Sequence, residues 1–162
     1  MATDYDTGVG EVHAALSDER YWRARLAGSG ADEARLDSME VGPAGGIDVV
    51  TTQVLRSDRL PSVVSQFHRG DLEIRREESW SPLHSCRADA TVSGSIASAP
   101  VSLAGAAELS GEGDRCRLAL RADVEVRVPL VGRKLENFIG NQLMGLLIAE
   151  QRFTTAWIAG ER

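Results

Sequence analysis

The chain has 162 residues and a formal net charge of −6, and it is 43% hydrophobic and 26% charged. This size and balance are typical of one globular domain with its own core, and they exclude a disordered chain. Lys and Arg are spread along the chain without the basic stripe that neutralises phosphates, so nucleic-acid binding is disfavoured. No apolar run approaches the roughly 20 residues that span a bilayer, so we expect no stable membrane insertion.

The start of the chain and its cysteines indicate the compartment. Residues 1–6 are acidic and lack the charged-then-apolar layout of a secretion signal. Two cysteines, Cys86 and Cys116, are too few for a disulfide scaffold. We therefore expect a cytoplasmic protein with two free thiols, which begin strands too far apart to be bridged.

Two short helices are predicted near the N-terminus. Apolar residues at helical spacing mark the first between residues 9 and 16, and Thr7 or Asp6 is placed to cap it. The second begins after Asp18, continues through an aromatic pair and closes at Gly28. Two helices joined so closely form a bent pair.

Six strands are predicted after this helical pair, where apolar residues begin to alternate with polar ones. Turns rich in Gly, Pro and Ser separate them. The strands cover residues 35–41, 47–55, 72–80, 86–96, 101–109 and 116–128. Residues 58–70 contain Pro61 and no sustained pattern, which indicates a long crossing loop with a turn of helix near residues 62–66.

The last strand and the helix after it carry the clearest pattern. Apolar residues alternate strictly with polar ones from Cys116 to Val128, as in a sheet with one dry face and one wet face. Pro129 and Gly132 end the strand, and a helix is predicted over residues 133–157. Its apolar residues recur at steps of three and four and mark the side that faces the sheet. They are Leu135, Ile139, Leu143, Leu146, Phe153 and Trp157.

This order of elements predicts a single α+β domain over residues 1–162. The dry face of the sheet and the apolar stripe of the long helix must bury each other. We therefore expect a curved antiparallel sheet of six or seven strands wrapped around the C-terminal helix. No internal repeat or low-complexity linker divides the chain.

Three short stretches carry a resemblance to known proteins. They are Tyr21-Trp22-Arg23-Ala24-Arg25-Leu26, Glu78-Ser79-Trp80 and Val128-Pro129-Leu130-Val131-Gly132-Arg133-Lys134-Leu135-Glu136. With the order of elements, they make the chain resemble the helix-grip SRPBCC superfamily of START domains, polyketide cyclases and birch-pollen-allergen-like proteins. The chain is most similar to a bacterial member family of uncharacterised function. The resemblance implies an additional strand at residues 2–6 and a hydrophobic cavity between sheet and helix. It implies no single chemistry, because members bind lipids, cyclise polyketides or recruit partners.

Charged residues fall on faces that should be dry. Arg76 and Glu78 share a strand face with Trp80, and Glu150 lies on the apolar stripe of the long helix. Burial of an unpaired charge costs several kcal/mol. We therefore expect an Arg76–carboxylate pair beside Trp80 that holds the polar head of a ligand, and Arg76 is the partner we expect for Glu150. The pKa of Glu150 would lie above its usual value if burial dominates, and below it if Arg76 reaches the carboxylate. The apolar stripe, with Leu143, Leu146 and Phe153, would hold the tail.

A second interpretation leaves these charges in solvent. A strand beyond the reach of the helix has no dry face, and a bulge would turn Arg76 and Glu78 outward. Small residues on the inner faces, such as Gly105, leave volume beneath the helix, but glycine also marks bends that curl a sheet. Both functions of Gly105 are compatible, because curling forms the cavity.

We expect neither a metal nor a cofactor. His84 and Cys86 lie two residues apart, but a zinc site needs at least three protein ligands and no third is evident. The chain also lacks a P-loop, a G-x-S-x-G elbow and a C-x-x-C pair. Met144 and Ile148 lie off the apolar stripe, where they indicate either a homodimer surface or, as we favour, packing at the sheet edge or scattered exposure.

These features favour a non-enzymatic protein that binds a small hydrophobic or amphipathic molecule, lipid-like or polyketide-like, in the cavity. One alternative is a cyclase or aromatase that uses Arg76, Glu78 or Glu150 as acid–base groups. No histidine falls convincingly on the inner face, which lowers that alternative. Another is a protein-interaction module whose pocket is filled.

Overall fold

The structure, a computed structural model, describes residues 1–130 and 132–160. Val131 and residues 161–162, which the predicted domain includes, lie outside the described residues. The strands are β1 (Ala2–Tyr5), β2 (Glu33–Val41), β3 (Ile47–Leu55), β4 (Leu72–Trp80), β5 (Arg87–Ile96), β6 (Val101–Glu112) and β7 (Arg115–Val126). The helices are α1 (Val9–Leu16), α2 (Glu19–Ala27), α3 (Ser62–Ser65) and α4 (Gly132–Ile158), with a 3-10 turn η1 (Ser57–Arg59).

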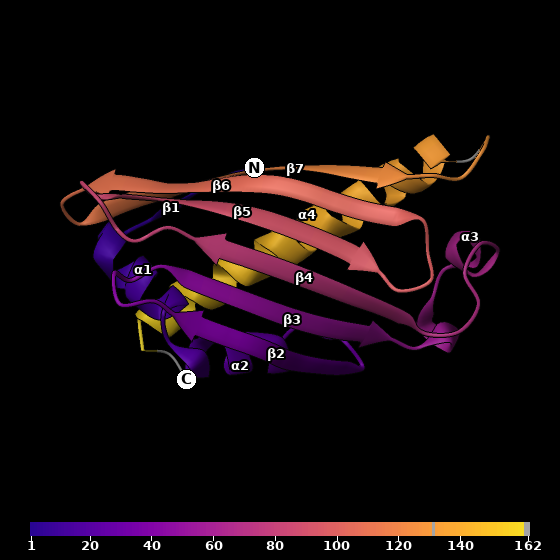
Figure 1. The fold of residues 1–162 in the computed structure, drawn as a ribbon, viewed down its shortest axis with the longest axis horizontal. Helices are drawn as coiled ribbons and strands as arrows, with labels where there is room; N and C mark the ends of the chain where they lie inside the picture. The colour runs from indigo at the N-terminus through magenta and orange to yellow at the C-terminus, as the bar shows by residue number, and fades with distance from the viewer. Residues whose placement is uncertain (131, 161–162) are drawn as a thin grey trace.

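The seven strands of the described chain form one curved sheet in the order β1-β7-β6-β5-β4-β3-β2. Every neighbouring pair is antiparallel. α4 runs diagonally across one face of the sheet, and α1 and α2 lie at the end where α4 finishes (Figure 1). This arrangement confirms the predicted helix-grip α+β fold.

The additional N-terminal strand is β1, which pairs with β7 at the edge of the sheet. Thr3 lies opposite Leu118, and Tyr5 lies opposite Cys116. Burial alternates along β7 as the sequence pattern predicts, because one face of the strand is covered and the other meets solvent.

The cap of α1 differs from the sequence prediction. Gly8, and not Thr7 or Asp6, occupies the N-cap position, and no side chain caps the helix. A Cβ at Gly8 would lie 3.0 Å from the carbonyl oxygen of Gly113, so the β6–β7 hairpin leaves little room for a side chain there. α2 is capped conventionally, because the carboxylate of Asp18 accepts a hydrogen bond from the Arg20 amide at 2.8 Å.

The cysteines are free and lie on either side of β6. β5 begins at Arg87 and not at Cys86, because Ser85 and Cys86 have φ angles of 47° and 58° and form the tight turn before it. Cys86 is exposed and Cys116 is buried. Cys86 therefore precedes β5 by one residue, and Cys116 lies in β7, the next strand but one.

α4 is fixed where it begins. A Cβ at Gly132 would lie 2.7 Å from the Val126 carbonyl oxygen, so the helix starts close against the end of β7. The Glu136 carboxylate accepts a hydrogen bond from the Val126 amide at 3.1 Å.

On the side of α4 away from its apolar stripe, Met144 and Ile148 are 44% and 39% exposed. None of the helices in the described ranges is long and apolar enough to cross a membrane.

The well-packed core lies at the α1–α2 end of the sheet. Its largest fully buried side chains are those of Trp22, Tyr21, Ile47, Leu109, Val12 and Val49. The opposite end is covered differently, by the first half of α4 and by the β3–β4 connection, which carries η1 and the predicted turn of helix as α3 (Figure 1). The two ends therefore differ in how completely side chains fill the space under the helix.

Candidate functional site

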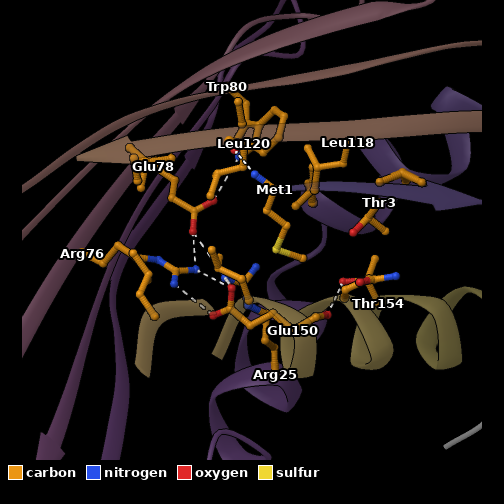
Figure 2. Close-up of a pocket in the computed structure, with 18 of the residues that line it drawn as sticks. Met1, Thr3, Arg25, Arg76, Glu78, Trp80, Leu118, Leu120, Glu150 and Thr154 are labelled. Atoms are coloured by element: carbon orange, nitrogen blue, oxygen red, sulfur yellow. Dashed lines mark hydrogen bonds and ion pairs between the residues drawn. The ribbon is translucent and has the colours of Figure 1, made fainter. Parts of the chain in front are cut away.

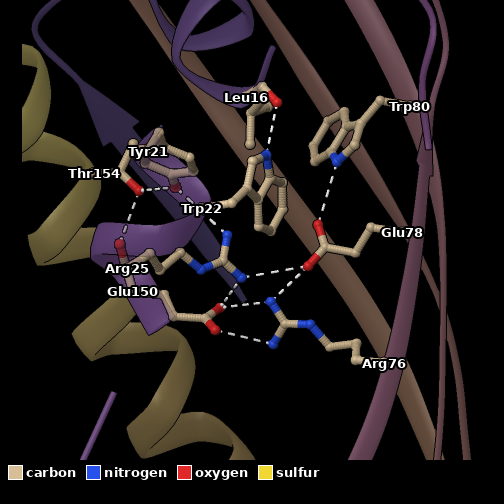
Figure 3. Close-up of polar contacts among 9 residues, drawn as sticks. All are labelled: Leu16, Tyr21, Trp22, Arg25, Arg76, Glu78, Trp80, Glu150 and Thr154. Atoms are coloured by element: carbon tan, nitrogen blue, oxygen red, sulfur yellow. Dashed lines mark hydrogen bonds and ion pairs between the residues drawn. The ribbon is translucent and has the colours of Figure 1, made fainter. Parts of the chain in front are cut away.

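Four charged side chains meet between the sheet and α4, and we call them the ion ring: Arg25, Arg76, Glu78 and Glu150 (Figure 3). Arg25 Nη2 lies 2.9 Å from Glu150 Oε2 and 3.3 Å from Glu78 Oε1. Arg76 lies 3.0 Å from Glu150 and 2.5 Å from Glu78, measured between guanidinium nitrogen and carboxylate oxygen. No side chain of the ring is more than 16% exposed. Each guanidinium contacts both carboxylates, so the four formal charges cancel.

Two tryptophans hold the ring in place. Trp80 Nε1 donates a hydrogen bond to Glu78 Oε2 at 3.2 Å. The Arg25 guanidinium carbon lies 4.5 Å from the centroid of the Trp22 ring, in cation–π contact. These contacts fix one carboxylate and one guanidinium in orientation.

A hydroxyl pair extends the network along α4. The Tyr21 and Thr154 hydroxyl oxygens lie 2.7 Å apart, and Thr154 donates to the Glu150 carbonyl oxygen at 2.8 Å. Arg25 Nη1 donates to the Tyr21 hydroxyl at 3.5 Å. Burial raises the pKa of the neighbouring Tyr5 phenol well above its usual value. The Tyr5 phenol therefore stays neutral.

Burial and ion pairing act in opposite directions on the pKa values of Glu150 and Arg25. It raises the pKa of Glu150; Arg25 opposes the rise and the Glu78 carboxylate adds to it. Burial by itself lowers the pKa of Arg25, but the Glu150, Tyr21 and Glu78 side chains outweigh that effect and raise it. Although Arg76 reaches Glu150, the pKa of Glu150 is raised, so burial outweighs pairing there.

The ring fastens three elements to one another. Arg25 comes from α2, Arg76 and Glu78 come from β4, and Glu150 comes from α4. Each buried ion costs several kcal/mol in lost hydration, which only its partners offset. The four side chains therefore hold α2 and α4 at a defined position against the sheet.

Sequence reasoning placed three members of the ring and missed Arg25. Arg76 and Glu78 point inward and meet Glu150 beside Trp80, and Arg76 and Glu150 are paired. Arg25 follows Tyr21 by four residues on a short helix and so shares its buried face. A charge on the buried face of a helix, the feature that marked Glu150, was the available signal.

Beside the ring lies a small cavity of about 80 Å³, which we call the inner chamber (Figure 2). Apolar side chains form most of its walls, among them Leu103, Ala107, Leu118, Leu120, Ala122 and Leu143. Arg76, Glu78, Trp80 and Glu150 also line it. The Thr3 hydroxyl, in a residue that is 4% exposed, has no hydrogen-bond partner within the described structure.

Three of the residues singled out in the sequence lie outside the walls of the inner chamber. Gly105 lies where β7 approaches closely, and a Cβ there would be 2.5 Å from the Arg121 carbonyl oxygen. Phe153 packs on Tyr21, with ring centroids 5.7 Å apart. Leu146 is half-buried on α4, and the next residue along the helix lines the chamber instead.

A second cavity, of about 350 Å³, lies at the other end of the sheet, and we call it the outer cavity. The first half of α4, the ends of β4 to β7 and the η1–α3 connection surround it. Its apolar walls include Leu72, Ile74, Ile96, Val101, Val126 and Ile139. Three polar side chains also line it, those of Arg59, His68 and Gln142. Sequence reasoning did not separate this space from the inner chamber.

Within the described residues, no group of three or more His, Cys, Asp or Glu side chains is arranged to hold a metal ion. The imidazole Nε2 of His68, at the outer cavity, lies 3.0 Å from the Asp71 carbonyl oxygen, to which it donates a hydrogen bond. Both cavities are therefore walled mainly by apolar side chains, and the ion ring lies at the inner chamber.

Comparison with known proteins identifies the family. The model of the family described as a protein of unknown function, DUF2505, matches residues 1–158. The chain belongs to this family. The uncharacterized proteins Rv0481c of Mycobacterium tuberculosis H37Rv and Mb0491c of Mycobacterium bovis are each 48% identical to it over 164 residues, which cover 98% of this chain and 94% of the relative.

Solved structures show the fold of this DUF2505 member. The Zhui aromatase/cyclase from Streptomyces sp. R1128 aligns with a TM-score of 0.65 and 9% identity, over 98% of this chain and 91% of that one. A conserved protein from Geobacillus kaustophilus aligns with a TM-score of 0.58 and 13% identity, over 98% and 93%. Ara h 8.0201 aligns with a TM-score of 0.50 and 10% identity, over 96% and 95%. The chain therefore has the SRPBCC fold.

Proposed function

We propose that the protein binds a small amphipathic molecule whose apolar body occupies the outer cavity. The volume of that cavity, about 350 Å³, carries the proposal. Small-molecule sites are mostly apolar and begin at roughly 300 Å³, whereas a space of about 80 Å³ is too small for a whole ligand. The outer cavity is therefore the main binding site, and the inner chamber is an accessory to it.

The polar end of the ligand lies at the mouth of the outer cavity. Arg59, Phe67 and Gln142 line the cavity and are also exposed, so they mark its opening. Arg59 Nη1 contacts Asp32 Oδ1 at 2.8 Å, but the Arg59 side chain is still 55% exposed and keeps donors for a ligand. The head therefore meets polar groups at the mouth while the apolar walls hold the body.

The predicted ligand-binding residues near the ion ring line the inner chamber and not the outer cavity. Arg76, Glu78 and Glu150 satisfy one another, so none offers an unpaired charge to a ligand head. Their contribution is to keep α4 in position over the cavity. Trp80 supports this arrangement through its hydrogen bond to Glu78.

A cyclase-type enzyme is the alternative that we retain. The protein with the 0.65 TM-score is named an aromatase/cyclase, and here Glu150 has a raised pKa, as a general acid requires. Against it, both ring carboxylates are engaged by two guanidiniums. The interaction-module alternative requires a filled pocket, and the outer cavity is not filled.

The proposal is tested by filling the outer cavity. Ile139→Trp places a large side chain in the cavity, and Ile148→Trp makes the same change on the exposed side of the same helix, where Ile148 is 39% exposed. Binding of the fluorescent probe 1-anilinonaphthalene-8-sulfonate should weaken at least tenfold in I139W and stay unchanged in I148W. Native mass spectrometry of freshly purified wild-type protein should show a bound small molecule. Probe binding that is indifferent to I139W would refute the proposal.

A further inference from the structure

The outer cavity and the inner chamber lie end to end under α4. On β4, Ile74 lines the outer cavity and Arg76 lines the inner chamber; on β6, Val101 lines the outer cavity and Leu103 the inner chamber. Residues two apart on a strand point to the same face and are about 7 Å apart. The two spaces therefore occupy consecutive rows of one sheet face.

The helix shows the same succession. Ile139 lines the outer cavity, and Leu143, about one helical turn later, lines the inner chamber. On the sheet side, Leu103 pairs with Gly94, where a Cβ would lie 3.4 Å from the Leu103 Cβ. Leu103 and Leu143 therefore form the wall of the inner chamber nearest the outer cavity, while Arg76, in the same row of the sheet, is held by its carboxylate partners.

The inner chamber is long for its volume. Its walls run from Leu103 to Leu118, which lies opposite Leu109, so they extend over six residues of β6, or about 20 Å. A volume of about 80 Å³ has room for a few waters or for part of one unbranched chain. A fused ring system does not fit.

The electrostatics favour a hydrocarbon end in this chamber. The ion ring beside it contains two cations and two anions, each contacting both opposite charges. A charged head would meet both signs without an unpaired partner and would lose its hydration. An apolar chain end loses no hydrogen bonds there.

We propose that Leu103 and Leu143 divide one elongated site and set the length of its ligand, an amphipathic molecule with an unbranched hydrocarbon chain. This inference rests on the proposed function of the outer cavity. The head stays at the mouth near Arg59 and Gln142, and the chain extends inward until it meets the two leucines. Chains longer than that limit need the inner chamber, which the leucines close.

The test is a chain-length series on the whole protein. The experiment measures how well saturated fatty acids of roughly 8 to 18 carbons displace 1-anilinonaphthalene-8-sulfonate from the wild type, L103A and L26A. Wild-type affinity should rise about fourfold per added methylene up to a limiting length and then stop rising. Leu103→Ala should move that limit to longer chains by at least two methylenes. Leu26→Ala, a matched loss from a buried site on α2 that lines neither space, should leave the limit unchanged.

Two further variants keep the test decisive. Leu143→Ala should also lengthen the limit, and it replaces L103A if that variant does not fold. Ala122→Leu, which refills the inner chamber, should restore the wild-type limit in the L103A background. If 1-anilinonaphthalene-8-sulfonate binds the wild type but no fatty acid displaces it, the unbranched-chain ligand is refuted and the proposed function stands; if the probe itself does not bind, the proposed function fails. If the acids bind but the limit does not move in L103A or L143A, or moves equally in L26A, only the division by Leu103 and Leu143 is refuted.

Discussion

Arg25 and Glu150 lie 2.9 Å apart although they come from opposite halves of the chain. One belongs to α2 and the other to α4, and both side chains are nearly buried, at 10% and 16% exposed. Their contact closes the ion ring and fixes the angle at which α4 crosses the sheet. The space left under the first half of α4 depends on that angle.

Removing one member of the ring should destabilise the protein strongly. Arg25→Met leaves Glu78 and Glu150 with one cation between them, and we expect a loss of about 3 kcal/mol in the free energy of unfolding. Arg23→Met, on the same helix with a 63% exposed side chain, should change it by less than about 0.5 kcal/mol. Urea denaturation measures both. Equal effects of R25M and R23M would show that the ring contributes little.

The raised pKa of Glu150 gives a sign for the pH dependence of stability. The folded state holds the Glu150 proton more tightly than the unfolded state does, so folding is favoured at low pH and that advantage is lost as pH rises above the usual value of 4.5. Glu150→Gln cannot titrate, so its stability relative to the wild type should increase as pH rises. Paired urea titrations at several pH values measure this difference. A relative decrease would mean that the two arginines dominate and hold the pKa low.

Gly105 should tolerate no side chain. A Cβ there would lie 2.5 Å from the Arg121 carbonyl oxygen and 3.1 Å from the Ala122 Cβ, so β6 and β7 would have to separate. We expect Gly105→Ala to cost about 2 kcal/mol of stability. Gly140→Ala on α4, where a Cβ meets nothing within 4 Å, should instead stabilise by about 0.5–1 kcal/mol. Thermal unfolding compares the two. A neutral G105A would show that the strands adjust freely.

The two thiols should react at different rates. Cys86 is exposed in its turn, whereas Cys116 is 4% exposed and its burial raises the pKa of its thiol. With 5,5′-dithiobis(2-nitrobenzoic acid), the native protein should release one equivalent quickly, and denaturant without reductant should reveal the second. Cys86→Ser should remove the fast phase alone. The absence of reactive thiols in denaturant would show a disulfide instead.

The local sequence pattern was sufficient to predict much of the fold of this protein. The alternation in β7 and the three-and-four spacing in α4 follow from the geometry of single elements, so both could be predicted from neighbouring residues alone. The same geometry placed Glu150 on the covered side of its helix. The predictions of the α1 cap and of the start of β5 were wrong at Gly8 and Cys86. There a distant hairpin and a tight turn determine the backbone conformation.

Only the tertiary structure decided the partners and the empty volume. Arg25 meets Glu150 because α2 packs near the end of α4, and no spacing along the chain records that contact. The outer cavity exists because the large buried side chains gather at the α1–α2 end, while the first half of α4 and the η1–α3 connection cover the other end. Volume is what remains after all elements have packed, so it depends on every long-range contact at once. Periodicity indicates which side chains point inward, and three-dimensional packing determines what they leave unfilled.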